Sequence, residues 1–227
     1  MNHQQPSIEF LGLTIQEPMN VFTDLLISFV CFMAYYRLNK LNKQGKANTC
    51  FRNYFLILGF GTLISGFIGH GFLNYFSFKW KLLGWTTSMV AITLIERAFI
   101  YYSGSFVNKK ILNFFLYANI VELVLFVVLT FVTLDFFYVR IQTTFGLLLY
   151  VFGLSLILYF RYNNLASQHI FKALGMSGLA AIVFVQNVGL GKWFNHLDVS
   201  HTLMAGAVWY FYQGAKNIDK PTDMDVS

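Results

Sequence analysis

The most regular feature of the chain is a series of seven long apolar runs separated by short polar stretches. Six of the runs cover about 18 to 25 residues, the length with which an α-helix crosses the hydrocarbon core of a bilayer, and the seventh fades after about 16. The alternating segments of about ten residues that are typical of membrane β-barrels are absent. The pattern therefore predicts an all-α membrane protein, a seven-transmembrane helical bundle. The predicted spans are residues 18–37, 54–76, 82–102, 111–134, 141–160, 171–194 and 198–213.

The polar stretches at the two ends divide the chain into three parts. Residues 1–16 are expected to form a polar N-terminal segment, 17–215 the seven-helix transmembrane domain and 216–227 a polar C-terminal tail. The N-terminal segment holds no Lys or Arg and one acid, Glu9, so it lacks the basic start of a secretory signal peptide. We therefore expect a multi-pass integral membrane protein whose first span is its own uncleaved insertion signal.

Composition supports this localisation and excludes other classes. The 227 residues are 56% hydrophobic and 11% charged, whereas an ordinary soluble domain is about 25% charged. The net charge of +6 does not indicate nucleic acid, because the Lys and Arg residues lie mainly in loops and form no basic patch with aromatic residues. Cys31 in the first span and Cys50 in a basic loop do not predict a disulfide. Membrane lipids are the expected partners.

The Lys and Arg residues also predict the orientation of the bundle, because cytoplasmic loops of membrane proteins carry an excess of them. If the N-terminus is outside, about 12 Lys and Arg fall on the inner side and about 4 on the outer side. We therefore expect the N-terminus outside and the C-terminus inside.

In this orientation, polar residues of five spans fall at a similar depth in the outer third of the bundle. Polar groups inside a membrane must satisfy one another or bind a ligand. The residues of this predicted layer are Glu17, Asn20 and Asp24 on the first span, His70 on the second, Trp85, Thr86, Thr87 and Ser88 on the third, Gln186 and Asn187 on the sixth, and His196 and His201 on the seventh.

Three of these residues, His70, His196 and His201, are candidate metal ligands. Three neutral imidazoles and one water molecule make a tetrahedral Zn²⁺ site with an open position. His196 and His201 would point about 140° apart on a regular helix. Both can aim at one point if the helix begins at Asp198, a favourable N-cap residue, because His196 then belongs to the preceding loop. We therefore predict that the three imidazoles meet.

Other interpretations of these residues remain open. The histidines could be hydrogen-bonded packing residues, or His70 and His201 could hold a haem between two helices. Glu17, Asn20 and Asp24 are expected to form a functional stripe on one helix face, but they could also form an interfacial cap with one paired acid.

The remaining titratable residues of interest are expected to have no chemical role. Glu96 and Arg97 in the third span and Glu122 in the fourth are expected to pair structurally or to snorkel. His3 is terminal and His169 is placed in an inner loop, so neither is expected to join the layer.

Seven spans, a second-span histidine and a histidine-containing start of the seventh span resemble the CREST superfamily. This group includes alkaline ceramidases, progestin and adiponectin receptors and membrane proteins that remodel GPI anchors. The local motifs are most similar to those of the alkaline ceramidases. Their first-helix pattern Glu-x-x-Asn-x-x-x-Asn appears here as Glu17, Asn20 and Asp24, with Asp in place of the last Asn.

The sequence also departs from the ceramidase motifs. Their second helix carries Ser-x-x-x-His; His70 fits, but Gly66 stands at the serine position and Ser65 lies one residue earlier. Their seventh-helix His-x-x-x-His is one residue longer here, from His196 to His201. Their third-helix Asp has no acidic counterpart in this chain.

The resemblance implies that the three histidines bind Zn²⁺ and that metal-bound water hydrolyses an amide or ester bond of a lipid. It implies that Asp24 or Asp198 replaces the missing acid as general base and that Ser65 stabilises an oxyanion. The favoured hypothesis is a zinc-dependent integral membrane hydrolase of the ceramidase kind. The alternatives are a non-enzymatic receptor-like or lipid-binding protein with a structural metal, and a membrane subunit of a larger assembly.

Overall fold

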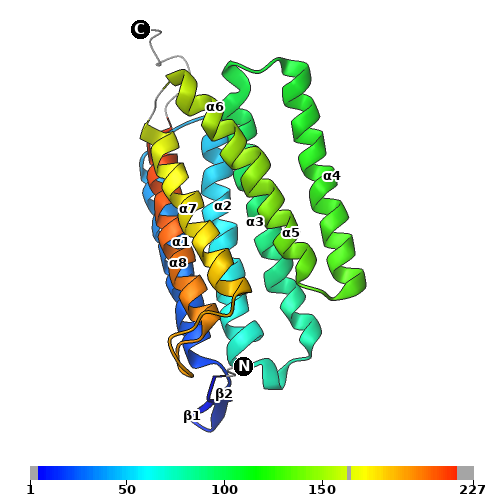
Figure 1. Cartoon of the computed structure of the whole chain (residues 1–227), viewed down its shortest axis with the longest axis vertical. Helices are drawn as coiled ribbons and strands as arrows, with labels where there is room; N and C mark the ends of the chain where they lie inside the picture. Colours follow the sequence, from blue (N-terminus) through cyan, green and yellow to red (C-terminus); the bar gives the residue numbers. More distant parts are fainter. Residues whose placement is uncertain (1–4, 163–164, 219–227) are drawn as a thin grey trace.

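The computed structural model describes residues 5–162 and 165–218. They form a bundle of long helices with a small β-hairpin at one end (Figure 1). The α-helices are α1 (Pro18–Lys40), α2 (Lys46–Ile64), α3 (Lys81–Tyr102), α4 (Lys109–Thr133), α5 (Phe137–Gly146), α6 (Gly153–Tyr162), α7 (Leu165–Val185) and α8 (His196–Lys216). The other elements are the strands β1 (Ile8–Phe10) and β2 (Leu13–Ile15), the π-helices η1 (Ser65–Gly71) and η5 (Leu147–Phe152), and the 3₁₀-helices η2 (Leu73–Tyr75), η3 (Phe78–Trp80) and η4 (Ser103–Ser105).

Several of these elements follow one another without a break, so the described residues make seven helical rods. α2 continues into the π-helix η1, and α5, η5 and α6 form one rod. α3 packs against α2, α4 and α5, while α8 packs against both α1 and α7 (Figure 1). The prediction of an all-helical bundle is thus confirmed for the body of the molecule, with the short hairpin as an addition.

Five stretches among the described residues are long and apolar enough to cross a membrane: Pro18–Lys40, Lys46–Gly71, Lys109–Thr133, Phe137–Arg161 and Leu165–Val185. α3 and α8 are of similar length but carry more polar residues, such as Glu96 and Arg97 in α3 and Asp198 in α8. About half of α3 is buried by neighbouring helices, including Glu96, so its polar side chains face protein. The membrane localisation predicted from the apolar runs is therefore supported.

Two predicted spans differ from the observed helices by more than a turn. α2 begins at Lys46 rather than near Tyr54, because polar residues extend the helix beyond its apolar part. α7 ends at Val185 rather than at residue 194. The apolar side chains that follow, such as Leu190, are exposed in a loop in which Gly191 has a φ of 156°. The prediction extended this span too far because the loop after Val185 is apolar, although it is not helical.

Apolar side chains occupy both the interior and the outer surface of the bundle. Phe51 of α2 and Phe99 of α3 are buried and meet edge to face, with ring centroids 5.5 Å apart. α4 by contrast exposes large apolar side chains along most of its length, as expected for a helix that faces lipid. They include Phe114, Tyr117, Val121, Val128 and Val132.

The N-terminal segment contains a short β-hairpin that the sequence did not predict. Residues 8–15 form the antiparallel hairpin, whose turn places Leu11 and Gly12 at φ of 52° and 77°. The hairpin lies at the end of the bundle where α1 and α8 begin (Figure 1). Of the predicted tail, residues 219–227 lie outside the described residues. Cys31 and Cys50 are free thiols, in agreement with the expectation of no disulfide.

The packing of α7 on α8 leads to a stability prediction. A Cβ added to Gly214 of α8 would lie 2.9 Å from Cγ1 of the fully buried Ile170 of α7. We expect Gly214→Ala to lower the free energy of unfolding by about 1–3 kcal/mol, because added atoms displace well-packed side chains. Chemical unfolding in detergent micelles measures this change.

The matched control is Gly178→Ala in α7, where an added Cβ meets nothing within 4 Å. This variant should leave the stability unchanged or raise it by up to about 1 kcal/mol, because Ala favours a helix more than Gly. Equal stability of the two variants would contradict the close approach of α7 and α8.

Candidate functional site

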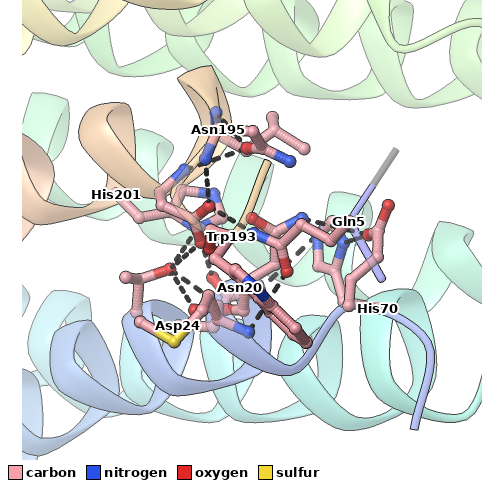
Figure 2. A network of polar contacts seen from close by, with 12 residues as sticks. Gln5, Asn20, Asp24, His70, Trp193, Asn195 and His201 are labelled. Carbon is pink, nitrogen blue, oxygen red and sulfur yellow. Dashed lines mark hydrogen bonds and ion pairs between the residues drawn. The ribbon is translucent and has the colours of Figure 1, made fainter. Parts of the chain in front are cut away.

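A network of polar side chains lies at the hairpin end of the bundle (Figure 2). It joins the start of α1, the end of η1, the start of α8 and the segment before β1, which are far apart in the sequence. The residues of this outer network are Gln5, Glu17, Asn20, Thr23, Asp24, His70, Asn195, Asp198 and His201.

The carboxylate of Asp24 lies between the imidazoles of His70 and His201. Asp24 is 3% exposed. Its Oδ2 is 3.9 Å from His70 Nε2 and its Oδ1 is 3.6 Å from His201 Nδ1. The two imidazole rings are 6.0 Å apart between centroids. Gly66 permits this approach, since a Cβ there would lie 3.0 Å from the Asp24 Cβ. α1, η1 and α8 thus contribute one group each to this cluster.

The Thr23 hydroxyl lies beside Nδ1 of His201, at 3.2 Å. Three acceptors are within reach of its proton: the carbonyls of Met19 and Asn20, at 3.0 and 3.2 Å, and Asp198 Oδ1, at 3.5 Å. With the proton donated to one of these, the hydroxyl oxygen accepts from His201 Nδ1, and this corresponds to the Nδ1–H tautomer with a free lone pair on Nε2. No residue within the described ranges forms a hydrogen bond to that Nε2, so it can act as a base.

Glu17 holds the other imidazole from the opposite side. Glu17 precedes α1, and its Oε2 contacts His70 Nδ1 and accepts from Asn20 Nδ2 at 3.1 Å. Burial alone would raise the pKa of the Glu17 carboxyl, but the hydrogen bond and charge of His70, assisted by Asn20, outweigh it and lower the pKa below its ordinary value. Glu17 is thus held as a carboxylate, which favours a proton on His70 Nδ1.

The start of α8 differs from the predicted one. Asn195 is the N-cap and accepts from the backbone of Leu197 and Asp198, while Asp198 Oδ2 accepts from the Asn195 N–H at 2.7 Å. This reciprocal pair is a capping box. The prediction that the helix begins at Asp198, with His196 in the preceding loop, is therefore wrong: His196 is the first residue of the helix.

Asp198 is also tied to the N-terminal segment. It is fully buried, and its Oδ2 accepts from the side chain of Gln5. The same Gln5 side chain donates to the carbonyl of Trp193 at 3.3 Å and accepts from the N–H of Met19 at 3.2 Å. Gln5 therefore joins the chain before β1 to α1 and to the loop before α8 (Figure 2).

His196 makes a different ring contact from the other two histidines, although it lies within electrostatic range of His201. Its ring packs against Phe184 of α7, with centroids 5.8 Å apart. Because the helix is regular from His196 to His201, the two side chains point in different directions. The structure thus brings His70 and His201 together without His196. His169, expected in a loop, lies in α7 and stacks on Tyr210 of α8.

The spacings Ser65–His70 and His196–His201 are each one residue longer than in the ceramidase motifs, and the helix accommodates the extra residue differently in the two places. Ser65 to His70 is one residue longer than the ceramidase spacing, and this stretch is π-helical, with Phe72 N–H bonded to Phe67 C=O. A π-turn takes up one extra residue relative to an α-turn. The extra residue between His196 and His201 lies in a regular α-helix, where it rotates the first histidine away.

Thr87 and Asn187 of the predicted polar layer make their side-chain hydrogen bonds outside the outer network. Thr87 donates to the carbonyl of Leu83 in its own helix at 2.6 Å, and Asn187 Nδ2 donates to the carbonyl of Val185 at 3.4 Å. Ser65, the predicted oxyanion-stabilising residue, has its Oγ against Gly84 of α3. The layer predicted over five spans is therefore narrower and is formed by α1, η1, α8 and the N-terminal segment.

A zinc ion was tested against this geometry. Imidazole and carboxylate groups suit Zn²⁺, but His196 is directed at Phe184 and His70 Nδ1 is engaged by Glu17. In residues 5–162 and 165–218, no group of three or more His, Cys, Asp or Glu side chains is arranged to hold a metal ion. The residues do not fit zinc as they are placed here, and zinc binding stays a prediction.

Three members of the outer network were not found by sequence reasoning. Asn195 carries a detectable signal, since Asn followed three residues later by Asp resembles a capping box before a helix. Thr23 lies three residues after Asn20 and so continues the polar stripe of α1. Gln5 carries no signal, because its role depends on how the N-terminal segment folds back.

The fold and the network define a class: a helical membrane protein with a buried acid–imidazole cluster near one end of its bundle. The chain belongs to a family of unknown function, DUF6962, whose model matches residues 19–220. No curated protein and no solved structure matches the chain.

The position of His196 leads to a test of the predicted zinc ligands. Because its ring packs on Phe184, we expect His196→Ala to leave the zinc content of the purified protein unchanged, as measured by elemental mass spectrometry. His169→Ala, at a histidine outside the network, is the control. A loss of zinc in His196→Ala but not in His169→Ala would contradict this expectation and would identify His196 as a zinc ligand.

Proposed function

We propose that the chain crosses the membrane seven times, with its N-terminus outside and its C-terminus inside. The support is the set of seven rods and the length of α3 and α8, 22 and 21 residues, or roughly 30 Å or more at 1.5 Å per residue. Neighbouring helices bury Thr93 and Glu96 of α3 and Asp198 and Ser200 of α8. The excess of Lys and Arg between α1 and α2, far from the hairpin, agrees with a cytoplasmic end there.

This topology predicts the accessibility of two tags in intact cells. An epitope inserted at the hairpin turn, beside Gly12, should bind antibody without permeabilisation. An epitope at the C-terminus should bind only after permeabilisation. The opposite result would reverse the orientation, and accessibility of both tags would require an even number of spans.

We also propose that the outer network is the active site of a hydrolase that cleaves an amide or ester bond of a membrane lipid. The observation that carries this proposal is the pairing of His201 with Asp24 and Thr23 on one side of its ring, which leaves Nε2 as a base. A carboxylate that holds one imidazole nitrogen while the other accepts a proton is a recurring hydrolytic arrangement. The 3.6 Å separation of Asp24 and His201 is too long for a hydrogen bond, but such contacts shorten in complexes with substrate.

The proposed chemistry is general base catalysis by His201. Nε2 takes a proton from a water molecule as the water oxygen attacks the carbonyl carbon of the lipid. The resulting imidazolium returns the proton to the leaving amine or alcohol as the carbon–nitrogen or carbon–oxygen bond breaks. Asp24 stabilises the imidazolium by its negative charge. Glu17 holds the His70 imidazole on the other side of Asp24.

The other two predicted catalytic residues receive different roles. Both oxygens of Asp198 face the capping box, Gln5 and Thr23, so Asp198 positions the start of α8. Ser65 packs on Gly84 and has no assigned step. The resemblance to alkaline ceramidases supports the substrate class, a lipid amide or ester, and leaves zinc as an additional possibility to be tested by metal analysis.

A second candidate function is a receptor-like or lipid-binding protein without turnover. It is favoured by one observation: Asp198, Asn195 and Gln5 satisfy one another and close the end of the bundle. In that case the outer network is a structural clamp, and lipid binds without being cleaved.

The hydrolase proposal predicts the effect of substitutions in the network. We expect His201→Gln to lower the turnover of a fluorescent ceramide or a matching ester lipid in vesicles by about 10²–10⁴-fold, because the base is removed. Asp24→Asn should also lower turnover, since the imidazolium loses its carboxylate. Release of the labelled fatty acid measures the rate.

His169→Gln is the matched control and should keep full turnover, because His169 lies near the start of α7, at the end of that helix away from the network. Helix content by circular dichroism shows whether each variant is folded. Saturable binding of both lipids by wild type without any release of fatty acid would reject the hydrolase and favour the binding protein.

A further inference from the structure

A second polar cluster lies within the bundle, away from the outer network. It is formed by Glu96 and Arg97 of α3, Asn119 and Glu122 of α4, and Gln142 of α5. Glu96, Asn119 and Gln142 are fully buried, and Glu122 is 8% exposed. Glu96 lies about 22 Å along α3 from its first residue. The other end of α3, Tyr102, is about 9 Å away, so the site lies within the proposed membrane region, in its inner half.

An amide connects the positive and negative groups of this inner cluster. Asn119 Nδ2 donates to Glu96 Oε2, and Asn119 Oδ1 accepts from Arg97 Nη1 at 3.3 Å. Arg97 also donates to the carbonyl of Leu116 at 3.3 Å and to the Tyr101 hydroxyl at 3.4 Å. Neither carboxylate makes an ion pair with Arg97 in the described part of the chain. The predicted structural pairing is therefore indirect, through Asn119.

Several buried oxygens of the inner cluster have no hydrogen-bond donor among the residues described. They are Glu96 Oε1, both carboxyl oxygens of Glu122, and Gln142 Oε1. Glu96 Oε1 is pressed against Gly146 of α5, where a Cβ would overlap it. Gln142 lies one turn before Gly146 in α5. Its side-chain NH₂ donates to the Thr93 hydroxyl at 3.4 Å, and Thr93 lies one turn before Glu96 in α3. A buried acceptor without a donor is costly, so these oxygens call for a ligand that supplies hydrogen or positive charge.

Charge counting limits what this ligand can be. Glu122 lies one turn after Asn119 in α4, and Asn119 contacts Glu96, so the two carboxyl groups belong to the same layer of the bundle and their charges interact. Arg97 contributes one positive charge. With both acids ionised, the cluster would carry a net charge of −1 in an apolar environment, which is expensive. One added proton makes the cluster neutral and converts one carboxylate oxygen into the missing donor.

We propose that Glu96 and Glu122 form an intramembrane proton-binding site that holds one exchangeable proton between them. The proton lies on one carboxyl group and is available to the acceptor oxygens of the other carboxyl group and of Gln142. Two carboxyl groups that share one proton are a known consequence of like charges in close proximity. This site is separate from the outer network and does not depend on hydrolysis there.

The titratable groups around the inner cluster do not change its net charge. On α3, Arg97 and the neutral Tyr101 face the cluster. Tyr150 of η5 is in electrostatic range of both carboxyl groups, and it is neutral. From α2, Cys50 is in range of Arg97, and Lys46 lies 5.4 Å from the centre of the Tyr101 ring. Lys46 is exposed, so water screens its charge.

Infrared spectroscopy of the full chain in lipid nanodiscs at neutral pH tests the proposal. Wild type should show the carbonyl stretch of a protonated carboxylic acid, which shifts in D₂O because the proton exchanges. Glu96→Gln and Glu122→Gln should each abolish this band, because the remaining carboxylate then balances Arg97. Arg97→Gln should increase the band roughly twofold, because a second proton is needed for neutrality.

Glu9→Gln in the exposed hairpin is the control and should leave the band unchanged. Circular dichroism identifies variants that do not fold; if Glu96→Gln fails because of its packing on Gly146, Glu122→Gln decides alone. A half-sized band in either single variant would overturn the proposal, because it means two independent protons. A band that is absent in sodium chloride and present in choline chloride would also overturn it, because sodium then occupies the site.

Discussion

A charge inside an apolar bundle needs a partner, and this constraint determines how the outer end of the molecule is built. Asp24 is almost completely buried near the start of α1. Its partners, His70 and His201, come from η1 and α8. Because each of the three elements contributes one group, none can move independently without exposing an unpaired charge to a low-dielectric environment. The acid–imidazole cluster is therefore the proposed reaction centre, and it also holds α1, η1 and α8 in position relative to one another.

The two polar clusters satisfy their groups in different ways. In the outer network, the Asp198 carboxylate is surrounded by donors from Asn195 and Gln5, and both imidazoles face carboxylates. Both clusters keep buried oxygens without a hydrogen-bond donor among the described residues: Asn20 Oδ1 and Asp24 Oδ2 in the outer network, and oxygens of Glu96, Glu122 and Gln142 in the inner cluster. Asp24 Oδ2 lies 3.9 Å from His70 Nε2, whereas the inner carboxyl oxygens make no ion pair within the described residues.

Helix geometry explains why the two extra residues relative to the ceramidase motifs have different effects. The one before His70 leaves that histidine in the cluster, and the one before His201 changes the direction of His196. The π-helical turn at Ser65–Gly71 takes up an added residue before His70. The start of α8 has no such turn, because the capping box of Asn195 and Asp198 holds a regular first turn. His196 is therefore directed to Phe184 and leaves the cluster. Asp24, from α1, lies between the two histidines that remain.

The apolar runs were enough to predict a helical membrane protein, because long apolar runs have few stable alternatives in lipid. The same runs indicated that Asp24, His70 and His201 lie near one end of the bundle. Which side chains meet there follows from the packing of distant segments: Thr23 and Gln5 belong to the network, and the ring of His196 packs on Phe184. A shift of one residue in a helix start rotates every side chain by about 100°. Such a shift is set by contacts between distant segments, which no local pattern of residues contains.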